Sequence, residues 1–175
     1  MFKIFLEYVN ETTILKIDNK EEFMSIFDGK TFLDGMYRTF KSSEIDKWNA
    51  IVGDSFPLYK GKFTVFGYDW LGRVFAINNI NGTVLLFEPG TGEVLDIPAT
   101  FEDFHNIELV EYHEDSLASR FFESWQKENV GCVLERTDCV GYKVPLFLNG
   151  NDTLDNLEVS NMEVYWEIMM PLINM

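Results

Sequence analysis

The segment from Lys62 to Pro98 constrains the fold of this chain more than any other stretch. It reads KFTVFGYDWLGRVFAINNINGTVLLFEPGTGEVLDIP, with apolar and aromatic runs separated by glycine-containing breaks. This pattern predicts strands at 63–68, 73–78, 83–88 and 93–97. Tight turns are expected near Asn81–Gly82 and Gly90–Gly92, because glycine adopts the positive φ angles that hairpins need. The segment therefore predicts an antiparallel meander.

Helical patterns lie on both sides of the meander. Helices are predicted over 21–27 and from Ser43 to Gly53, and then over 114–129 and from Ser160 to Pro171. Asp18 and Ser160 are the expected N-caps of the first and last of these helices. A further strand, KVPLFL, is expected at 143–148. A chain of 175 residues without repeats or a linker predicts a single domain.

Charge is distributed unevenly along the chain. The hydrophobic share of 46% and the aromatic share of 15% are enough to build a core. The chain is therefore expected to fold despite its net charge of −15. Residues 1–87 hold 11 acids and 10 bases, whereas residues 88–175 hold 18 acids and 4 bases. Nucleic acids and anionic membranes repel such a surface, so neither is an expected partner. A basic partner fits, although charge of this kind also serves solubility alone.

The stretch FEDFHNIELVEYHED, from Phe101 to Asp115, concentrates this charge without any Lys or Arg. An acidic catalytic site, a cation site, a surface for a basic partner and an ordinary solvated face are all compatible with it. If the stretch is an ordinary solvated face, the positive ends of helix dipoles account for about half of its acids. The candidate residues are Glu102, Asp103, Glu108, Glu111, Glu114 and Asp115.

Motifs for catalysis or metal binding do not emerge. The chain has no HExxH, GxSxG or CxxC pair, and His105 and His113 match no metal-ligand spacing. Both histidines are expected at the surface, and no cofactor or metal is predicted. A carboxylate pair in an acidic cleft leaves a hydrolase as one alternative.

Cellular location follows from the first residues and the cysteines. MFKIFLEYVNE is a poor secretory signal, and no apolar run approaches the thickness of a bilayer. Cys132 and Cys139 are too few for a disulfide framework and are expected as free thiols. A cytoplasmic protein is predicted.

Four stretches together carry a resemblance to a known family. FGYDWLGRVFAI, LLFEPGTGEVLDIP, DSLASRFFESW and GYKVPLFLNGNDTLDNLEVSNMEVYWEI resemble the C-terminal domain of type VI secretion immunity proteins. That family is similar in organisation to the SUKH superfamily, which includes the fungal cell-wall regulator of the Smi/Knr type. The resemblance covers about 35–170. It leaves 1–34 as a reduced N-terminal extension, where longer members carry a domain that resembles a glutamate-tRNA ligase insert.

The resemblance implies both a fold and a function. The fold would be α+β, a largely antiparallel sheet flanked by helices. The function would be that of a cytosolic, non-enzymatic immunity protein that binds and neutralises a toxin, often a nuclease. Nucleases present cationic surfaces to phosphates, so the six acids are predicted to bind a cognate basic toxin. A regulatory or scaffold module of the Smi/Knr type is the alternative, and the hydrolase is the less favoured one.

Overall fold

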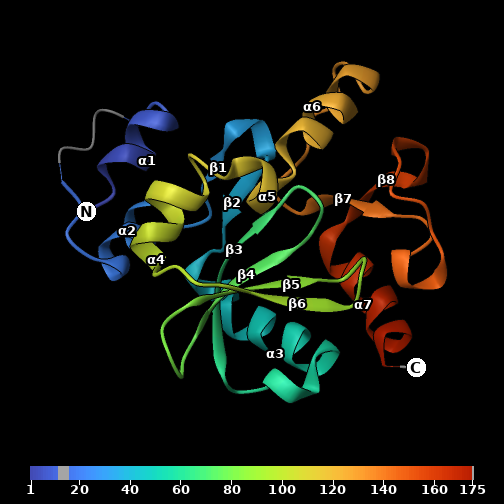
Figure 1. Cartoon of the computed structure of the whole chain (residues 1–175), viewed down its shortest axis with the longest axis horizontal. Coiled ribbons are helices and arrows are strands. Elements are labelled where there is room, and N and C mark those ends of the chain that lie inside the picture. Colours follow the sequence, from blue (N-terminus) through green and yellow to red (C-terminus); the bar gives the residue numbers. More distant parts are fainter. Residues whose placement is uncertain (12–15, 175) are drawn as a thin grey trace.

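The computed structural model describes residues 1–11 and 16–174 (Figure 1). Its main sheet has the order β1-β2-β3-β4-β5-β6, so each strand pairs antiparallel with its neighbour in sequence. The strands are β1 (Thr31–Phe32), β2 (Tyr37–Thr39), β3 (Phe63–Asp69), β4 (Val74–Asn78), β5 (Val84–Glu88) and β6 (Glu93–Ile97). A separate antiparallel pair consists of β7 (Asp138–Tyr142) and β8 (Leu157–Asn161).

Helices and short helical turns make up the remaining regular structure. The α-helices are α1 (Lys3–Tyr8), α2 (Lys20–Ile26), α3 (Ile45–Ser55), α4 (Phe101–Asp103), α5 (His113–Leu117), α6 (Ser119–Glu128) and α7 (Met162–Ile173). A π-helical turn, η4 (Phe104–Glu108), continues α4. The 3₁₀ turns are η1 (Leu33–Gly35), η2 (Ser42–Glu44), η3 (Pro57–Tyr59), η5 (Leu146–Leu148) and η6 (Leu154–Asn156).

The predicted meander is confirmed. Strands β3 to β6 match the four expected ranges to within one residue at each end. Gly82 and Gly92 have φ angles of 78° and 70° in the turns where glycine was expected. The expected fold class, an α+β domain with an antiparallel sheet flanked by helices, is also confirmed.

A β-bulge in β3 decides which side chains face each side of the sheet. The pairing with β4 shifts register between Val65 and Gly67, so Phe66 is the extra residue. Phe63 and Val65 belong to the hydrophobic cluster on one face, and beyond the bulge Tyr68 belongs to the same cluster. Without the extra residue, strict alternation would send Tyr68 to the opposite face.

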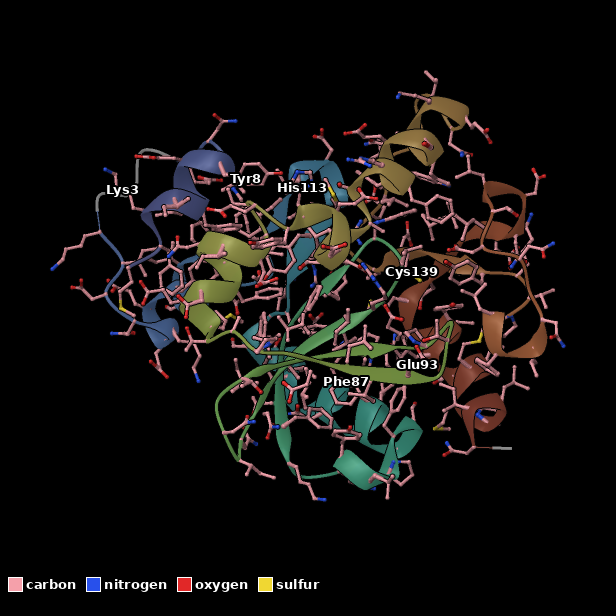
Figure 2. The ribbon with its side chains drawn as sticks, in the orientation of Figure 1. Lys3, Tyr8, Phe87, Glu93, His113 and Cys139 are labelled. Atoms are coloured by element: carbon pink, nitrogen blue, oxygen red, sulfur yellow. The ribbon has the colours of Figure 1, made fainter. Side chains whose placement is uncertain are left out.

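Helices cover both faces of the sheet (Figure 1). On one face, Phe66, Phe75 and Leu86 pack with apolar side chains of α1, α2 and α4. On the other face, Val65, Leu85 and Phe87 pack with those of α3 and α7. Figure 2 places Phe87 between β5 and α3, where it contacts the rings of Phe56, Tyr59 and Phe63. Burial on both faces explains why β5 reads as an uninterrupted apolar run, VLLF.

Residues 1–11 and 16–34 contribute side chains to the main core. Phe5 and Phe23 lie in the same hydrophobic cluster as Phe66 and Phe104, and the Phe5 N–H donates to Asn106 Oδ1 at 3.2 Å. The division of the chain into a reduced extension and an immunity-like domain stays a prediction.

The helix expected over 114–129 is wrong in one respect, because it is two helices. Ala118 has left-handed angles (φ 50°, ψ 48°) and separates α5 from α6. Glu114 Oε2 accepts from Ser119 Oγ (2.8 Å) and from the Arg120 N–H (2.9 Å), and so satisfies the first turn of α6. Leu117 of α5 and Trp125 of α6 are buried, while Phe121 of α6 is half-buried.

The C-terminal part departs from expectation in one further way. KVPLFL is not a strand, because Pro145 leads into η5 and the Leu146 N–H donates to Gly90 O (2.8 Å). In α7, Val164 and Ile168 are 49% and 55% exposed. The buried face carries Tyr165, Trp166 and Met169.

Helix starts are displaced from the expected caps. The N-cap of α2 is Asn19 and not Asp18, and its side chain accepts from the Glu22 N–H. The N-cap of α7 is Asn161 and not Ser160, and its side chain accepts from the N–H groups of Glu163 and Val164. A 3₁₀ turn, η2, occupies the position where Ser43 was expected to begin a helix. The α7 helix also continues past Pro171 to Ile173.

His105 contradicts the expectation of a surface residue. Its ring is fully buried among aromatic side chains, including Phe23 and Phe101 at centroid distances of 4.4 Å. Nδ1 lies 2.7 Å from Phe101 O, and Nε2 lies 2.9 Å from the Tyr37 hydroxyl. A carbonyl can only accept, so Nδ1 carries the proton and Nε2 accepts from Tyr37. Burial lowers the pKa of His105 to about 3.

This buried histidine predicts loss of stability in acid. The unfolded chain takes up a proton on His105 below its ordinary pKa of about 6.5, whereas the folded chain does so only near pH 3. The contribution of the neutral His105 ring to the free energy of unfolding is therefore fully present above about pH 6.5. It should fall by about 1.4 kcal/mol per pH unit between those two values. Urea unfolding at pH 7 and pH 5 measures the change.

A His105→Gln variant isolates this contribution, since an amide takes up no proton in this range. Its free energy of unfolding should depend less on pH than that of the wild type. NMR titration of the wild-type ring gives an independent readout that does not require the variant to fold. A ring that titrates near pH 6 in the folded protein would contradict the prediction.

Candidate functional site

The six predicted acids lie on one continuous segment. Glu102 and Asp103 are on α4, Glu108 ends η4, and Glu111 is in the turn before α5. Glu114 and Asp115 are on α5. The exposed members are Asp103, Glu111 and Asp115, and the half-buried members are Glu102, Glu108 and Glu114.

Two of the six acids have local structural roles. Thr100 accepts from the Asp103 N–H (3.1 Å) and donates to Asp103 Oδ2 (2.8 Å), so this pair caps α4. Glu114 caps α6, and the backbone hydrogen bond from Arg120 holds the pKa of Glu114 below its ordinary value. For these two carboxylates, position in the fold explains the charge.

The other four acids lack basic neighbours. Within residues 1–11 and 16–174, no Lys or Arg lies within ion-pair distance of Glu102, Glu108, Glu111 or Asp115. Elsewhere, Lys47 pairs with Glu163 and Arg136 pairs with Glu44. Burial raises the pKa of Glu108, and the charge of Asp115 adds to the rise. We call these four residues, with Asp103 and Glu114, the acidic segment.

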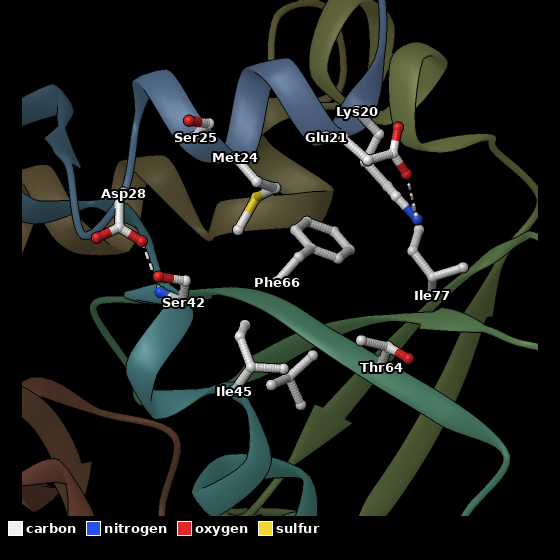
Figure 3. Close-up of a pocket in the computed structure, with 11 residues that line it drawn as sticks. Lys20, Glu21, Met24, Ser25, Asp28, Ser42, Ile45, Thr64, Phe66 and Ile77 are labelled. Atoms are coloured by element: carbon white, nitrogen blue, oxygen red, sulfur yellow. Dashed lines mark hydrogen bonds and ion pairs between the residues drawn. The ribbon is translucent and has the colours of Figure 1, made fainter.

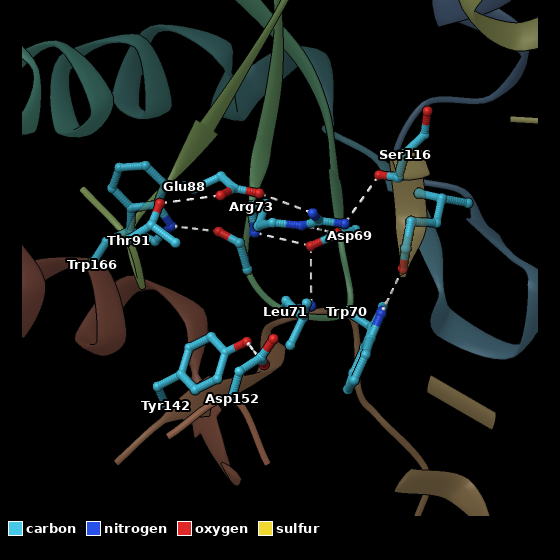
Figure 4. Close-up of polar contacts among 12 residues, drawn as sticks. Asp69, Trp70, Leu71, Arg73, Glu88, Thr91, Ser116, Tyr142, Asp152 and Trp166 are labelled. Carbon is cyan, nitrogen blue, oxygen red and sulfur yellow. Dashed lines mark hydrogen bonds and ion pairs between the residues drawn. The ribbon is translucent and has the colours of Figure 1, made fainter. Parts of the chain in front are cut away.

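A buried ion network of Asp69, Arg73 and Glu88 contacts α5 through Ser116 (Figure 4). Arg73 Nε donates to Asp69 Oδ2 at 2.6 Å, and Arg73 Nη1 donates to Glu88 Oε1 at 2.9 Å. Asp69 Oδ1 also accepts from the N–H groups of Leu71 (3.0 Å) and Arg73 (2.9 Å). Burial raises the pKa of Asp69 to about 6, and Arg73 opposes that rise, so the carboxylate is ionised at pH 7.

This network connects the sheet to the acidic segment. Arg73 Nη2 donates to Ser116 O at 3.0 Å, and the indole N–H of Trp70 donates to Leu117 O at 2.8 Å. Both acceptors are backbone carbonyls of α5. The charged side chain of Arg73 and the aromatic side chain of Trp70, both from the β3–β4 turn, therefore anchor this helix. The acidic segment is thereby fixed in orientation relative to the meander.

A cavity of about 280 Å³ adjoins the network. Arg73, Glu88, Glu114, Tyr142 and Asp152 contribute its polar lining. They come from the β3–β4 turn, β5, α5, β7 and the loop after β7, so residues distant in sequence meet here. Of the predicted site residues, the structure brings Glu114 to this cavity, whereas the other five acids do not line it. Sequence reasoning missed Asp69, Arg73 and Glu88, although an Asp and an Arg flanking a glycine turn was an available signal.

A larger groove of about 550 Å³ runs between α2 and the sheet (Figure 3). Met24, Ile45 and Phe66 form its apolar floor and walls. Lys20 and Glu21 pair at one end, and the Ser42 N–H donates to Asp28 at the other. Among the residues that the structure describes, no group of three or more His, Cys, Asp or Glu side chains could hold a metal ion.

The structure also tests the expectations that both cysteines are free thiols and that no segment is long enough to cross a bilayer. Cys132 is an exposed free thiol and Cys139 a buried one. Burial raises the pKa of the Cys139 thiol far above its ordinary value, so it stays protonated. No helix within the described part of the chain is long and apolar enough to span a bilayer.

Comparisons with known proteins add a likeness of fold. A scan of family models and a search of curated proteins found no match for this chain. Among solved structures, the chain is similar to Atu4351 from Agrobacterium tumefaciens, with a TM-score of 0.66 and 17% sequence identity. The alignment covers 96% of this chain and 79% of that one. At this identity the likeness concerns the fold alone.

The ion network should matter greatly for stability. Asp69→Asn removes the buried charge that faces Arg73, and it should lower the free energy of unfolding by about 3 to 5 kcal/mol. The matched control is Asp54→Asn, which removes an exposed charge 2.5 Å from Lys60. The control should change stability by less than about 1 kcal/mol. Urea unfolding curves measure both, and equal small losses would show that the network is dispensable.

Proposed function

We propose that this chain is a non-enzymatic immunity protein that binds and neutralises a cognate basic toxin. The observation that supports this most directly is the set of acids without basic neighbours on a firmly held segment. The chain has no Lys or Arg from Val74 to Ser119, and nine carboxylates fall in that range. Such a surface repels nucleic acid and attracts basic protein.

Electrostatic complementarity suits this function because it chiefly raises the rate of association. A toxin must be captured before it acts, so a fast encounter is worth more to an immunity protein than additional affinity. Anchoring by Arg73 and Trp70 supports the proposal, since a preformed acidic surface requires no ordering on binding. A nuclease is the favoured toxin class, because its cationic surface would otherwise hold phosphates. Cytoplasmic location and type VI secretion belong to this proposal, and they follow from the family resemblance.

Charge reversal tests the proposal. The variant Glu102→Lys/Glu111→Lys/Asp115→Lys changes three acids that have no side-chain hydrogen bond among the described contacts. Association with a cognate basic toxin should slow by about tenfold or more at low salt, and high salt should remove most of the difference. Stopped-flow kinetics at two ionic strengths measure this.

A matched control reverses three exposed acids elsewhere, Asp46, Glu158 and Glu167. It changes the net charge equally, so it separates local steering from overall charge. The acidic-segment variant should slow association more than the control does, while both retain near wild-type stability. Rates that respond equally to both variants, or to neither, would argue against this surface. In the latter case the regulatory scaffold of the Smi/Knr type becomes the better interpretation.

A further inference from the structure

The cavity beside the ion network has a lining suited to one kind of guest. We infer that it binds a guanidinium group, supplied by an arginine side chain of the bound protein. This inference rests on the proposed function, because it names the chemical group of the basic partner that enters the surface. The cavity is not part of the predicted site, apart from Glu114.

Size restricts the guest to something small. The volume of about 280 Å³ is at the lower limit of ordinary ligand pockets, which span roughly 300–1,000 Å³. The apolar and aromatic lining comes from Leu71, Phe121, Tyr142 and Leu146. A single side chain with an apolar stem and a polar end matches this lining better than a cofactor does.

The charge of the lining selects a cation. Arg73 is the base among the lining residues, and each of its three nitrogens already donates to an oxygen, of Asp69, Glu88 or Ser116. Asp69 and Glu88 balance the charge of Arg73, and Glu114 pairs with Arg120, which lies outside the lining, at 4.0 Å. Asp152 has no Lys or Arg within ion-pair distance among the described residues, so the lining keeps an excess of negative charge. The carboxylates of Glu114 and Asp152 repel an anionic guest, and a neutral guest gains no charge attraction from them.

Two acceptor oxygens remain for the guest. Asp152 Oδ1 accepts from the Tyr142 hydroxyl at 2.7 Å, and Glu114 Oε2 accepts from Ser119 and Arg120. Among the described contacts, Asp152 Oδ2 and Glu114 Oε1 accept no hydrogen bond. The two carboxylates approach from the loop after β7 and from α5.

A guanidinium fits these features better than an ammonium does. It is planar, donates several N–H groups in different directions, and stacks on aromatic rings. The rings of Phe121 and Tyr142 offer such surfaces in the lining, and both side chains are half-buried. An ammonium is more strongly hydrated and loses more on entering a partly apolar cavity.

Titration with N-acetyl-L-arginine methylamide tests the inference. In NMR spectra of the ¹⁵N-labelled full chain, saturable shifts are expected at Gly90, Thr91, Tyr142 and Asp152. The citrulline analogue has the same shape without the charge, and it should cause none. Asp152→Asn should weaken binding of the arginine probe by about two- to fivefold. The matched control, Asp155→Asn, removes an exposed carboxylate outside the cavity and should leave binding unchanged.

Several outcomes would overturn the inference. They are the absence of saturable shifts, equal shifts with the citrulline analogue, and shifts confined to the five acids of the acidic segment that do not line the cavity, Glu102, Asp103, Glu108, Glu111 and Asp115. Each leaves the proposed function standing, because the charge-reversal kinetics concern Glu102, Glu111 and Asp115, which do not line the cavity. Conversely, NMR shifts at the cavity residues together with association rates unchanged by charge reversal would contradict electrostatic steering by the acidic segment. The cavity would still be supported as a guanidinium site.

Discussion

The carboxylate of Asp69 is the interaction on which the rest of the structure depends. It orders the β3–β4 turn by accepting from Leu71 and Arg73. Within that turn, the Trp70 backbone bonds to Met36 O and accepts from the Val140 N–H, and its indole reaches α5. Gly72 O accepts from the indole of Trp166 on α7 at 2.8 Å. One five-residue turn thus joins the main sheet to the second sheet and to two helices.

A buried carboxylate is costly unless its hydrogen bonds are satisfied, and here they are. Each oxygen of Asp69 accepts at least one hydrogen bond, and Arg73 donates to two carboxylates and one carbonyl. The arrangement stabilises a particular orientation of α5 as well as the fold. This is how a feature of the core bears on the proposed partner surface, since α5 carries Glu114 and Asp115.

Local patterns predicted the meander, because alternation and turn glycines are decided by neighbours in sequence. The break at Ala118 could not be predicted in this way, since an alanine with φ of 50° is held there by Glu114 and the start of α6. His105 was expected at the surface because it is polar. Its buried hydrogen-bond partner, Tyr37, lies far away in sequence, so local patterns could not predict the pair. The cavity was beyond sequence reasoning, because five separate elements meet to form it. The role of the acidic segment as a binding surface stays a prediction.

The two outer strands of the main sheet have a consequence for association between copies of this chain. An unpaired strand edge can recruit another strand and begin aggregation. At one edge, β1 has two residues, too few to act as a template. At the other edge, β6 carries exposed Glu93 and Asp96, and Pro98 follows it directly. Two such edges would repel each other by like charge. The negative charge concentrated after Phe87 therefore protects the exposed sheet edge from self-association, whether or not a partner is bound.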